Sequence, residues 1–306
     1  GGLREKEIYD TIRFWTMSVK DYLDEYFESD IVKAHLAGSA IIGTALGPYS
    51  PGSAYVLLHH YMGEVDGTVG AWGYSRGGMG SISKAMSKSL IASGGEIKAA
   101  AEVAKVLIKN NRCYGVVLKN GDEIYAKRIV SNMDVKRTFL KTVDKDQLPK
   151  DFYNAVKNFK IRGSSGKLNI ALDDLPKWKS IPVGDPAGTG DMHITQSIEE
   201  MEGAYDDWKK GEWSRFPYVD MCVPSINDPT MAPQGKHYMS VFIQYVPYNL
   251  ANGGWTEEKR LEFGKHVMGR INEYSTNFND IILHAEIRSP KELEEEVGLT
   301  EGNIFQ

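Results

Sequence analysis

Apolar residues recur at every third or fourth position in several long segments, and this spacing is typical of amphipathic helices. Residues 3–28 follow the pattern and predict one long helix, with apolar positions at Ile8, Ile12, Trp15, Val19, Leu23 and Phe27. A more apolar helix is expected at 30–46, with Asp30 as its N-cap. The same spacing predicts further helices at 81–93, 149–159, 197–210 and 257–274.

Shorter segments carry alternating or continuous apolar residues between turn signals, which is typical of strands. We treat the apolar run 55–62 as extended, and 67–74 as a glycine-rich strand. Hairpin signals at Asn110-Asn111 and Asn120-Gly121 predict a β-meander with strands at 97–107, 112–118, 123–125 and 128–130. Further strands are expected at 166–172, 192–195, 218–223 and 238–245. Strands that alternate with single helices predict a mixed α/β (α+β) fold.

The composition of the 306 residues is that of a folded globular chain of one large or two ordinary domains, with 42% hydrophobic and 25% charged residues. A net charge of −5 gives no electrostatic reason to expect nucleic-acid binding. The longest apolar stretches, such as 37–46, are too short for a membrane span. Two distant cysteines, Cys113 and Cys222, favour a reducing compartment and exclude a C-x-x-C dithiol.

The glycine-rich string Gly77-Gly78-Met79-Gly80 stands between a predicted strand and a predicted helix. It has two interpretations. Glycine tolerates positive φ, so the string forms a tight turn. The second interpretation is close approach of a cofactor to the N-terminus of a helix. No G-x-G-x-x-G motif occurs in the chain.

The glycine turn is one of six strings that together point to a known family. They are 51–60 (PGSAYVLLHH), 70–74 (GAWGY), 77–80 (GGMG), 228–233 (DPTMAP), 244–248 (QYVPY) and 302–305 (GNIF). In these strings the chain resembles the phytoene-desaturase-like FAD oxidoreductases, most closely the branch of pyridine nucleotide-disulphide oxidoreductase domain-containing proteins.

The resemblance implies an FAD-binding domain of the GR2 type, built from separated segments, and a substrate domain. Residues 73–133 would be the central FAD segment, and 1–72 and 134–306 the substrate domain. Its cofactor contacts would come from Gly77, Gly78, Met79, Val103, Ser131 and Asn132. The pyrophosphate-binding βαβ unit would precede Gly1 and the last FAD segment would follow Gln306, so we expect the 306 residues alone not to retain FAD.

The resemblance also implies a cavity for an apolar substrate. The residues expected to line it are Tyr55, His59, Trp72, Tyr74, Gln244 and Tyr245. The alternative for the aromatic residues is ordinary core. For His59-His60 the alternatives are packing, a polar contact in the cavity or metal binding, for which no further ligands lie nearby in sequence. We expect no metal site. The acidic pairs Asp173-Asp174 and Asp206-Asp207 are expected on solvated faces.

The function that the resemblance implies is oxidation of an apolar, lipid- or isoprenoid-like substrate by hydride transfer to flavin. A redox-neutral flavin-dependent isomerase and a non-catalytic binding or assembly protein are the alternatives. A cytoplasmic location is expected, or the mitochondrial matrix in a eukaryote, and peripheral membrane contact stays open. The sequence identifies neither a catalytic residue nor the oligomeric state.

Overall fold

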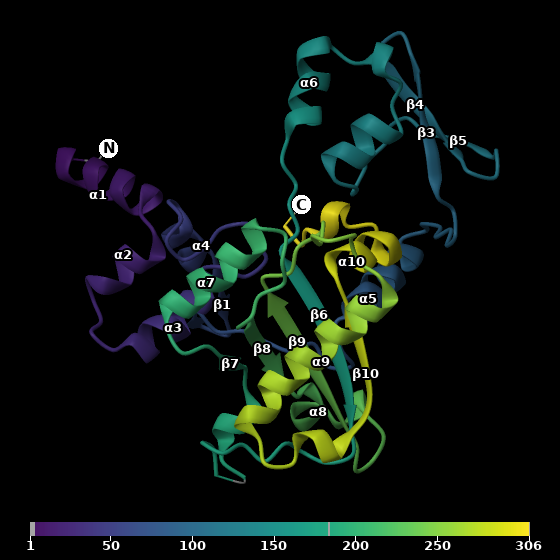
Figure 1. Cartoon of the computed structure of the whole chain (residues 1–306). Coiled ribbons are helices and arrows are strands. Elements are labelled where there is room, and N and C mark those ends of the chain that lie inside the picture. Colours follow the sequence, from purple (N-terminus) through teal and green to yellow (C-terminus); the bar gives the residue numbers. More distant parts are fainter. Residues whose placement is uncertain (1–3, 183, 306) are drawn as a thin grey trace. The chain divides into compact units, whose positions relative to one another are not determined.

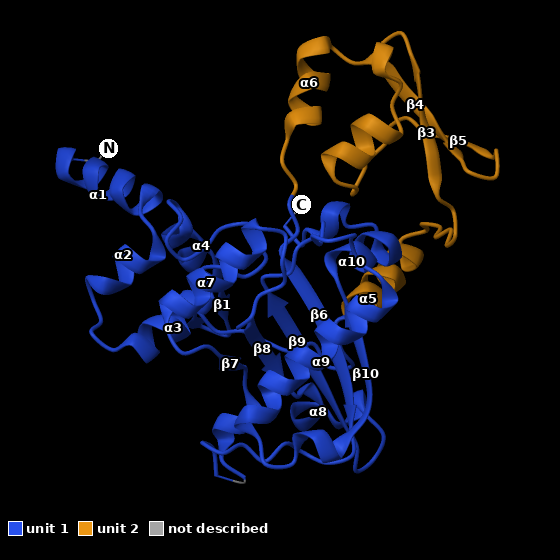
Figure 2. Cartoon of the chain, viewed as in Figure 1, with its two compact units in different colours: residues 1–81, 162–305 blue, residues 82–161, 306 orange. Residues whose placement is uncertain are grey.

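The computed structural model describes residues 4–182 and 184–305, which form two compact units (Figure 2). One combines the described residues up to Ser81 with Arg162–Phe305, and the other comprises Ile82–Ile161. The sequence predicts boundaries after residues 72 and 133, so the central segment of the structure begins and ends later in the chain. The assignment of the parts to a cofactor and a substrate domain stays a prediction.

The larger unit is built on a five-stranded antiparallel sheet with the strand order β10-β6-β9-β8-β7 (Figure 1). Its strands are β6 Ser165–Leu172, β7 Met192–Ile194, β8 Tyr218–Cys222, β9 His237–Gln244 and β10 Ile282–Arg288. The predictions for β6 to β9 are confirmed. The sequence missed β10 because it is an edge strand with a register shift between Ile282 and His284 and mostly exposed or half-buried residues.

One face of this sheet packs against α9, Glu257–Tyr274, whose predicted bounds are confirmed. Phe263, Val267 and Ile271 recur every four residues on the helix and are fully buried. They meet alternate residues of the central strands, which are also fully or almost fully buried: Leu168, Ile170, Leu172, Val219, Met221, Met239, Val241 and Ile243. This cluster is the main hydrophobic core.

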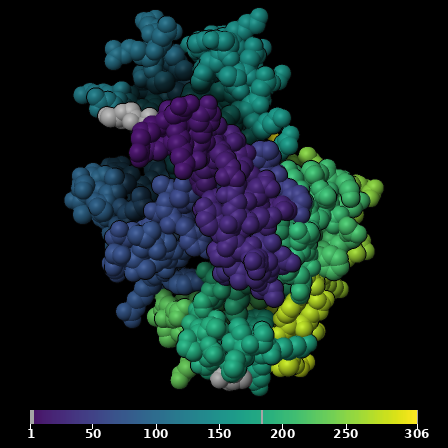
Figure 3. All heavy atoms as spheres, turned by 90° about the vertical axis from the view of Figure 1, so that its left-hand side faces the viewer, coloured from purple at the N-terminus to yellow at the C-terminus, as the bar shows by residue number. Residues whose placement is uncertain are grey.

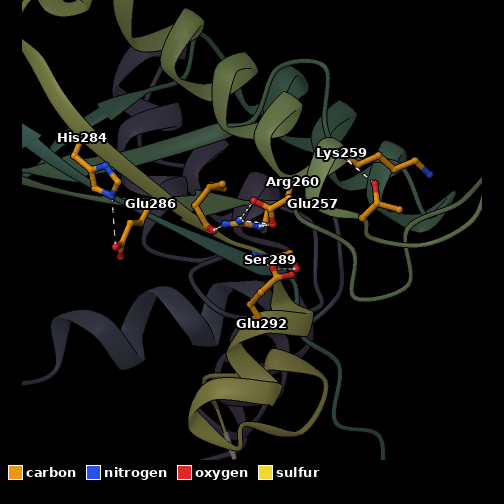
Figure 4. A network of polar contacts seen from close by, with 9 residues as sticks. Glu257, Lys259, Arg260, His284, Glu286, Ser289 and Glu292 are labelled. Carbon is orange, nitrogen blue, oxygen red and sulfur yellow. Dashed lines mark hydrogen bonds and ion pairs between the residues drawn. The ribbon is translucent and has the colours of Figure 1, made fainter.

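Polar contacts tie α9 to β10 and cap the start of the helix α10, Pro290–Val297, that follows β10 (Figure 4). The Arg260 guanidinium donates to the Ile287 carbonyl oxygen at 2.7 Å and also binds the Glu257 carboxylate. Ser289 and Glu292 form a capping box at the start of α10, with the Ser289 N–H donating to Glu292 Oε2 at 2.8 Å. These contacts fix the edge of the sheet.

The N-terminal helices differ from the prediction. Instead of one helix over 3–28, the structure has α1 Glu5–Thr16 and α2 Val19–Asp24, and residue 3 lies outside the described residues. The break comes at Met17, which is extended, and at Ser18, whose hydroxyl accepts from the Asp21 N–H and starts a new helix.

The second predicted helix is shorter than 30–46, because α3 ends at Gly38, and its N-cap is Ser29 and not Asp30. The run treated as extended is the helix α4, Ser53–Tyr61, which begins after Gly52 with φ +85°. Of the strand predicted at 67–74, only the two-residue β2, Thr68–Val69, forms, paired with β1, Glu64–Val65. When an apolar segment is short, its sequence pattern does not distinguish a helix from a strand.

The helices α2, α3, α4 and α7, Ile198–Lys209, form a second core at one end of the sheet. Tyr218 and Tyr245 from the sheet are buried in it. Gly38 of α3 lies so close to Tyr218 that an added Cβ would stand 2.4 Å from the phenol oxygen. The helices α1 to α3 lie at the surface of the face shown in Figure 3, where Tyr9, Ile12 and Trp15 of α1 are each at least half exposed.

The smaller unit contains the predicted meander. Its strands are β3 Val103–Lys109, β4 Arg112–Leu118 and β5 Glu123–Tyr125, in that order, and its helices are α5 Gly80–Ala92, which begins just before the unit, and α6 Lys150–Asn158. The glycine turn at Gly94 that ends α5 is confirmed, with φ +82°. Two parts of the prediction are wrong: 97–102 is not part of β3, and 128–130 is not a strand.

Candidate functional site: the polar face of the five-stranded sheet

The face of the sheet opposite α9 is lined by polar and titratable side chains. Strand register sets them in two adjacent rows, because side chains alternate along each strand. The first row runs Lys167, Phe242, Asp220, His193, and the second runs Asn169, Ser240, Cys222. All seven are half-buried. The alternation of apolar and polar residues along these strands therefore places the hydrophobic core on one side of the sheet and the polar side chains on the other.

Two side-chain hydrogen bonds lie at the centre of this face. The Lys167 ammonium donates to the Ser240 hydroxyl, and the Tyr238 hydroxyl donates to Asn169 Oδ1 at 2.8 Å. Burial lowers the pKa of Lys167, whereas the neighbouring Cys222 and Asp220 favour its charged form. The Lys167 side chain is therefore a cation in an environment where partial burial disfavours the charged form.

Asp220 and His193 stand side by side, with 3.6 Å between Oδ2 and Nε2. Burial, with help from the charge of Asp191, raises the pKa of Asp220 to about 7. Burial and the neighbouring His35 ring, whose centroid is 5.1 Å away, lower the pKa of His193 to about 4. At neutral pH the imidazole is uncharged, and the carboxyl group is divided between its two protonation states. Such pairs with opposed shifts are typical of sites that bind or move protons.

Tyr74 closes one edge of the polar face. Its hydroxyl donates to Asp191 Oδ1 at 2.8 Å and also contacts the Cys222 side chain. Burial is the main cause that raises the pKa of Tyr74, followed by the hydrogen bond to Asp191. Of the six residues predicted to line a substrate cavity, Tyr74 is thus placed beside the titratable rows.

The glycine turn is attached to the same region. The Gly77 N–H donates to Asp228 Oδ2 at 2.5 Å, and a Cβ on Gly78 would lie 3.1 Å from the Met231 side chain. Asp228 also accepts from the Thr230 N–H and hydroxyl. These contacts hold the strings 77–80 and 228–233 together in the structure. A groove of about 450 Å³ beside them is lined by Tyr74–Arg76 and Asn227–Thr230.

The turn fits close approach of a cofactor but not a pyrophosphate cradle. Gly77 and Gly78 have φ of +80° and +78°, and the Met79 side chain is 71% exposed. However, the Gly77 N–H is taken by Asp228 and the Gly78 N–H by the Ser75 carbonyl oxygen at 2.9 Å. Neither is free for a phosphate. Contact of these residues with FAD stays a prediction.

The other residues predicted to contact the cofactor lie in the smaller unit. Val103 begins β3, an edge strand of the meander, and an edge strand presents backbone groups outward. The Ser131 hydroxyl binds the Thr138 hydroxyl at 2.7 Å, and Asn132 is exposed. Their role toward FAD also stays a prediction.

Three of the predicted cavity residues belong to an aromatic cluster around α4. Tyr55 stacks on Trp15 with 4.3 Å between ring centroids, and His59 lies beside both Tyr55 and His60. His60 in turn stacks on Trp72 at 5.8 Å. The sequence suggests an extended run here, in which adjacent side chains point to opposite faces. Since α4 is a helix, the two histidines do not alternate in this way. His60 Nδ1 binds the Val56 carbonyl oxygen at 2.9 Å, and His59 is exposed.

Gln244 and Tyr245 are different, because both are 0% exposed. The Gln244 amide accepts from the Gly43 N–H at 2.8 Å and donates to the carbonyl oxygens of Ile41 and Thr44. The Tyr245 hydroxyl donates to the Leu46 carbonyl oxygen at 2.6 Å. These side chains hold the segment after α3 against the sheet. The six predicted residues therefore divide among three surroundings.

Sequence reasoning missed Lys167, Asn169, His193, Asp220 and Cys222. The signal was present in β6, where Lys167 and Asn169 alternate with buried apolar residues. Only the register showed that the polar positions of four strands form one surface. Across residues 4–182 and 184–305, no group of three or more His, Cys, Asp or Glu side chains is placed to bind a metal ion. In the same residues no helix is long and apolar enough for a membrane span.

Comparison with known proteins gives relatives along almost the whole chain, although no protein-family model matches it. The chain is 38% identical over 298 residues to the rat pyridine nucleotide-disulfide oxidoreductase domain-containing protein 2, a match that covers 95% of the chain and 51% of the rat protein. It is 33% identical over 193 residues to a chloroplastic prolycopene isomerase of Daucus carota, which covers 61% of the chain and 28% of the isomerase. The chain thus spans about half the length, or less, of these relatives.

A solved structure supports the same fold. The chain matches an oxidoreductase from Methanosarcina mazei with a TM-score of 0.57 and 18% identity, over 94% of this chain and 61% of the other. The mixed α/β fold predicted from the sequence is thereby confirmed. The resemblance on which it was based is confirmed as well: the chain is a homologue of the pyridine nucleotide-disulfide oxidoreductase domain-containing proteins and, more distantly, of the prolycopene isomerases.

Proposed function

We propose that the whole protein is an FAD-dependent oxidoreductase, that it oxidises an apolar, isoprenoid-like substrate by hydride transfer to flavin, and that the polar sheet face is one wall of its substrate site. The names of the relatives support the class of reaction, and the name prolycopene isomerase supports an isoprenoid. The chain covers about half of the rat relative, so the proposal concerns the complete protein.

The observation that carries the proposal is the attachment of the glycine turn to the polar face. Tyr74, three residues before the turn, reaches Asp191 and Cys222 on the sheet. Asp228 and Met231, shortly after β8, hold the turn itself. If the turn approaches the cofactor, the polar face is therefore the part of this unit that lies near the reacting atoms.

The residues of this face would place the substrate and control its polar surroundings. When bound, flavin would supply the hydride acceptor. Tyr74 and Asp191 hold one edge of the face, and Asp220 is poised to exchange a proton near neutral pH. The hydride would go to flavin, and the second hydrogen would leave the adjacent carbon as a proton that water can accept. We therefore assign no residue as catalytic base.

The test uses the full-length protein. We expect a visible flavin spectrum that bleaches when an apolar polyene substrate such as phytoene is added without oxygen, together with a product two hydrogens lighter by mass spectrometry. A full-length protein without flavin under all conditions would overturn the proposal and favour a binding or assembly protein.

A redox-neutral isomerase is the second candidate, and the match to prolycopene isomerase favours it. It would require reduced flavin but leave the mass of the substrate unchanged. Incubation of the reduced full-length protein with a cis-polyene such as prolycopene, followed by chromatography and mass spectrometry, separates the two reactions. A changed retention time at constant mass would identify the isomerase.

A further inference from the structure

Lys167 is a half-buried cation that lacks an acidic partner. Among residues 4–182 and 184–305, the structure shows no ion pair between Lys167 and a carboxylate, and the Lys167 ammonium donates a hydrogen bond to the neutral Ser240 hydroxyl. An ammonium group has three donors and no acceptor. Two N–H groups of Lys167 are therefore left for another group, in a place where burial penalises an uncompensated charge.

Asn169 adds further donors beside it. Asn169 lies two residues along β6 on the same face, and its Oδ1 accepts from the Tyr238 hydroxyl at 2.8 Å. This bond fixes the orientation of the amide, so Nδ2 presents its two N–H groups away from Tyr238. Within the described residues, Nδ2 donates to no acceptor. The centre of the face thus has a surplus of donors.

The remaining charged groups on this face do not satisfy that surplus. Arg288, beside Lys167 on β10, is balanced by Glu286 and Glu296 at 3.1 and 2.7 Å. Asp191 accepts from Tyr74. Asp220 and Cys222 stand on β8, two strands from β6, and neither forms an ion pair with Lys167. Burial raises the pKa of both, to about 7 for Asp220, so Asp220 balances the lysine charge only in part near neutral pH. Among the described residues, Lys167 is thus a charge on this face without a carboxylate at ion-pair distance.

We propose that the centre of the polar face binds a carboxylate on the substrate, with Lys167 Nζ and Asn169 Nδ2 as the donors. The inference rests on the proposed function and names the substrate more closely: an apolar acid, with an isoprenoid-like chain and a carboxylate. A carboxylate has two acceptor oxygens and the negative charge that would balance the Lys167 ammonium. Hydrogen bonds between ionised groups are stronger than those between neutral groups. A substrate hydroxyl could accept hydrogen bonds from these donors but would not balance the charge of Lys167.

The test compares two ligands with one skeleton, all-trans-retinoate and all-trans-retinol, on the full-length protein. We expect the wild type to bind retinoate about tenfold more tightly, as followed by quenching of tryptophan fluorescence. Lys167→Met keeps the length of the side chain and removes its charge and donors. It should weaken retinoate binding at least tenfold and change retinol binding less than twofold. Asn169→Ala should weaken retinoate binding by a smaller factor.

The matched control is Lys177→Met, because Lys177 is exposed and lies before α7, outside the polar face. It should leave both affinities unchanged, and thermal melting checks that each variant folds. Equal affinities of the wild type for the two ligands, or equal losses for both in Lys167→Met, would overturn the inference.

The outcomes separate this inference from the proposed function. Preference for retinoate that depends on Lys167, without any flavin chemistry, would support the carboxylate site and contradict the oxidoreductase. Oxidation of a neutral polyene without preference for retinoate would support the oxidoreductase and contradict the carboxylate site.

Discussion

The two faces of the five-stranded sheet use the same strands for different purposes. The face toward α9 consists of fully buried aliphatic side chains, whereas the opposite face carries a lysine, an aspartate, a histidine and a cysteine that are half-buried. Burial of each aliphatic side chain contributes about 1.5–3 kcal/mol to folding. The titratable groups contribute little or oppose folding, since burial shifts their pKa values against charge. The difference indicates that the apolar face stabilises the fold, whereas the polar face is the one on which the proposed substrate site rests.

The largest effect is expected on the apolar face. Ile170→Ala removes a side chain that is 0% exposed and leaves a cavity, so the free energy of unfolding should fall by about 2–5 kcal/mol in urea denaturation. The matched variant is Asn169→Ala, one residue away on the other face. It should cost less than about 1 kcal/mol, because the half-buried Tyr238 hydroxyl can turn to water. Equal losses would remove the distinction between the faces.

Gln244 tests the covered end of the polar face. Gln244→Leu leaves the Gly43 N–H and the Ile41 and Thr44 carbonyl oxygens without their partner, and we expect a loss of about 1–3 kcal/mol in the free energy of unfolding. Gln234→Leu, at an exposed position, should change it by less than about 0.5 kcal/mol. A tolerated Gln244→Leu together with weaker retinol binding would instead assign Gln244 to the substrate site.

The dependence of stability on pH tests the open part of the polar face. The folded-state pKa of Asp220 is raised from 3.8 to about 7, so its protonated form stabilises the fold at low pH and this contribution is lost as pH rises toward 7. Relative to wild type, Asp220→Asn should therefore gain stability between about pH 4 and 7, by up to about 1.4 kcal/mol per pH unit. Urea denaturation at several pH values measures it.

His193 provides the control of opposite sign. Its folded-state pKa is lowered from 6.5 to about 4, so its contribution is present above pH 6.5 and is lost as pH falls toward 4. The free energy of unfolding of His193→Gln, relative to that of the wild type, should therefore be higher at pH 4 than at pH 6.5. Parallel slopes for the two variants would contradict the assigned shifts.

The smallest effect is expected at the edge of the face. Tyr74→Phe removes the hydrogen bond to Asp191, which is exposed, and should lower the free energy of unfolding by about 0.5 kcal/mol. If Tyr74 bounds the substrate site, the same variant should change ligand affinity more than stability. A change in neither would leave Tyr74 as a surface residue.

The periodicity of the sequence predicted most helices and strands, including α9, β4, β5 and the central strands of the sheet. It failed where local alternatives have similar energies. Residues 55–62 are apolar enough for either a strand or a helix, and the packing of α4 against α1 and α2 decides for the helix. At Ser18, a single capping side chain ends one helix pattern and starts another.

The candidate site shows the same division. The sequence by itself determined the family resemblance, the glycine turn and the alternation of Lys167 and Asn169 with apolar residues, because these depend on neighbours in the chain. Only the tertiary structure decided that Gln244 and Tyr245 are core, that Tyr74 reaches Asp191, and that Lys167, Asp220 and His193 share one row. The physical reason is that strand register joins residues far apart in the sequence, such as Lys167 and Phe242, which are 75 positions apart. Burial then sets the pKa of the titratable groups in the row.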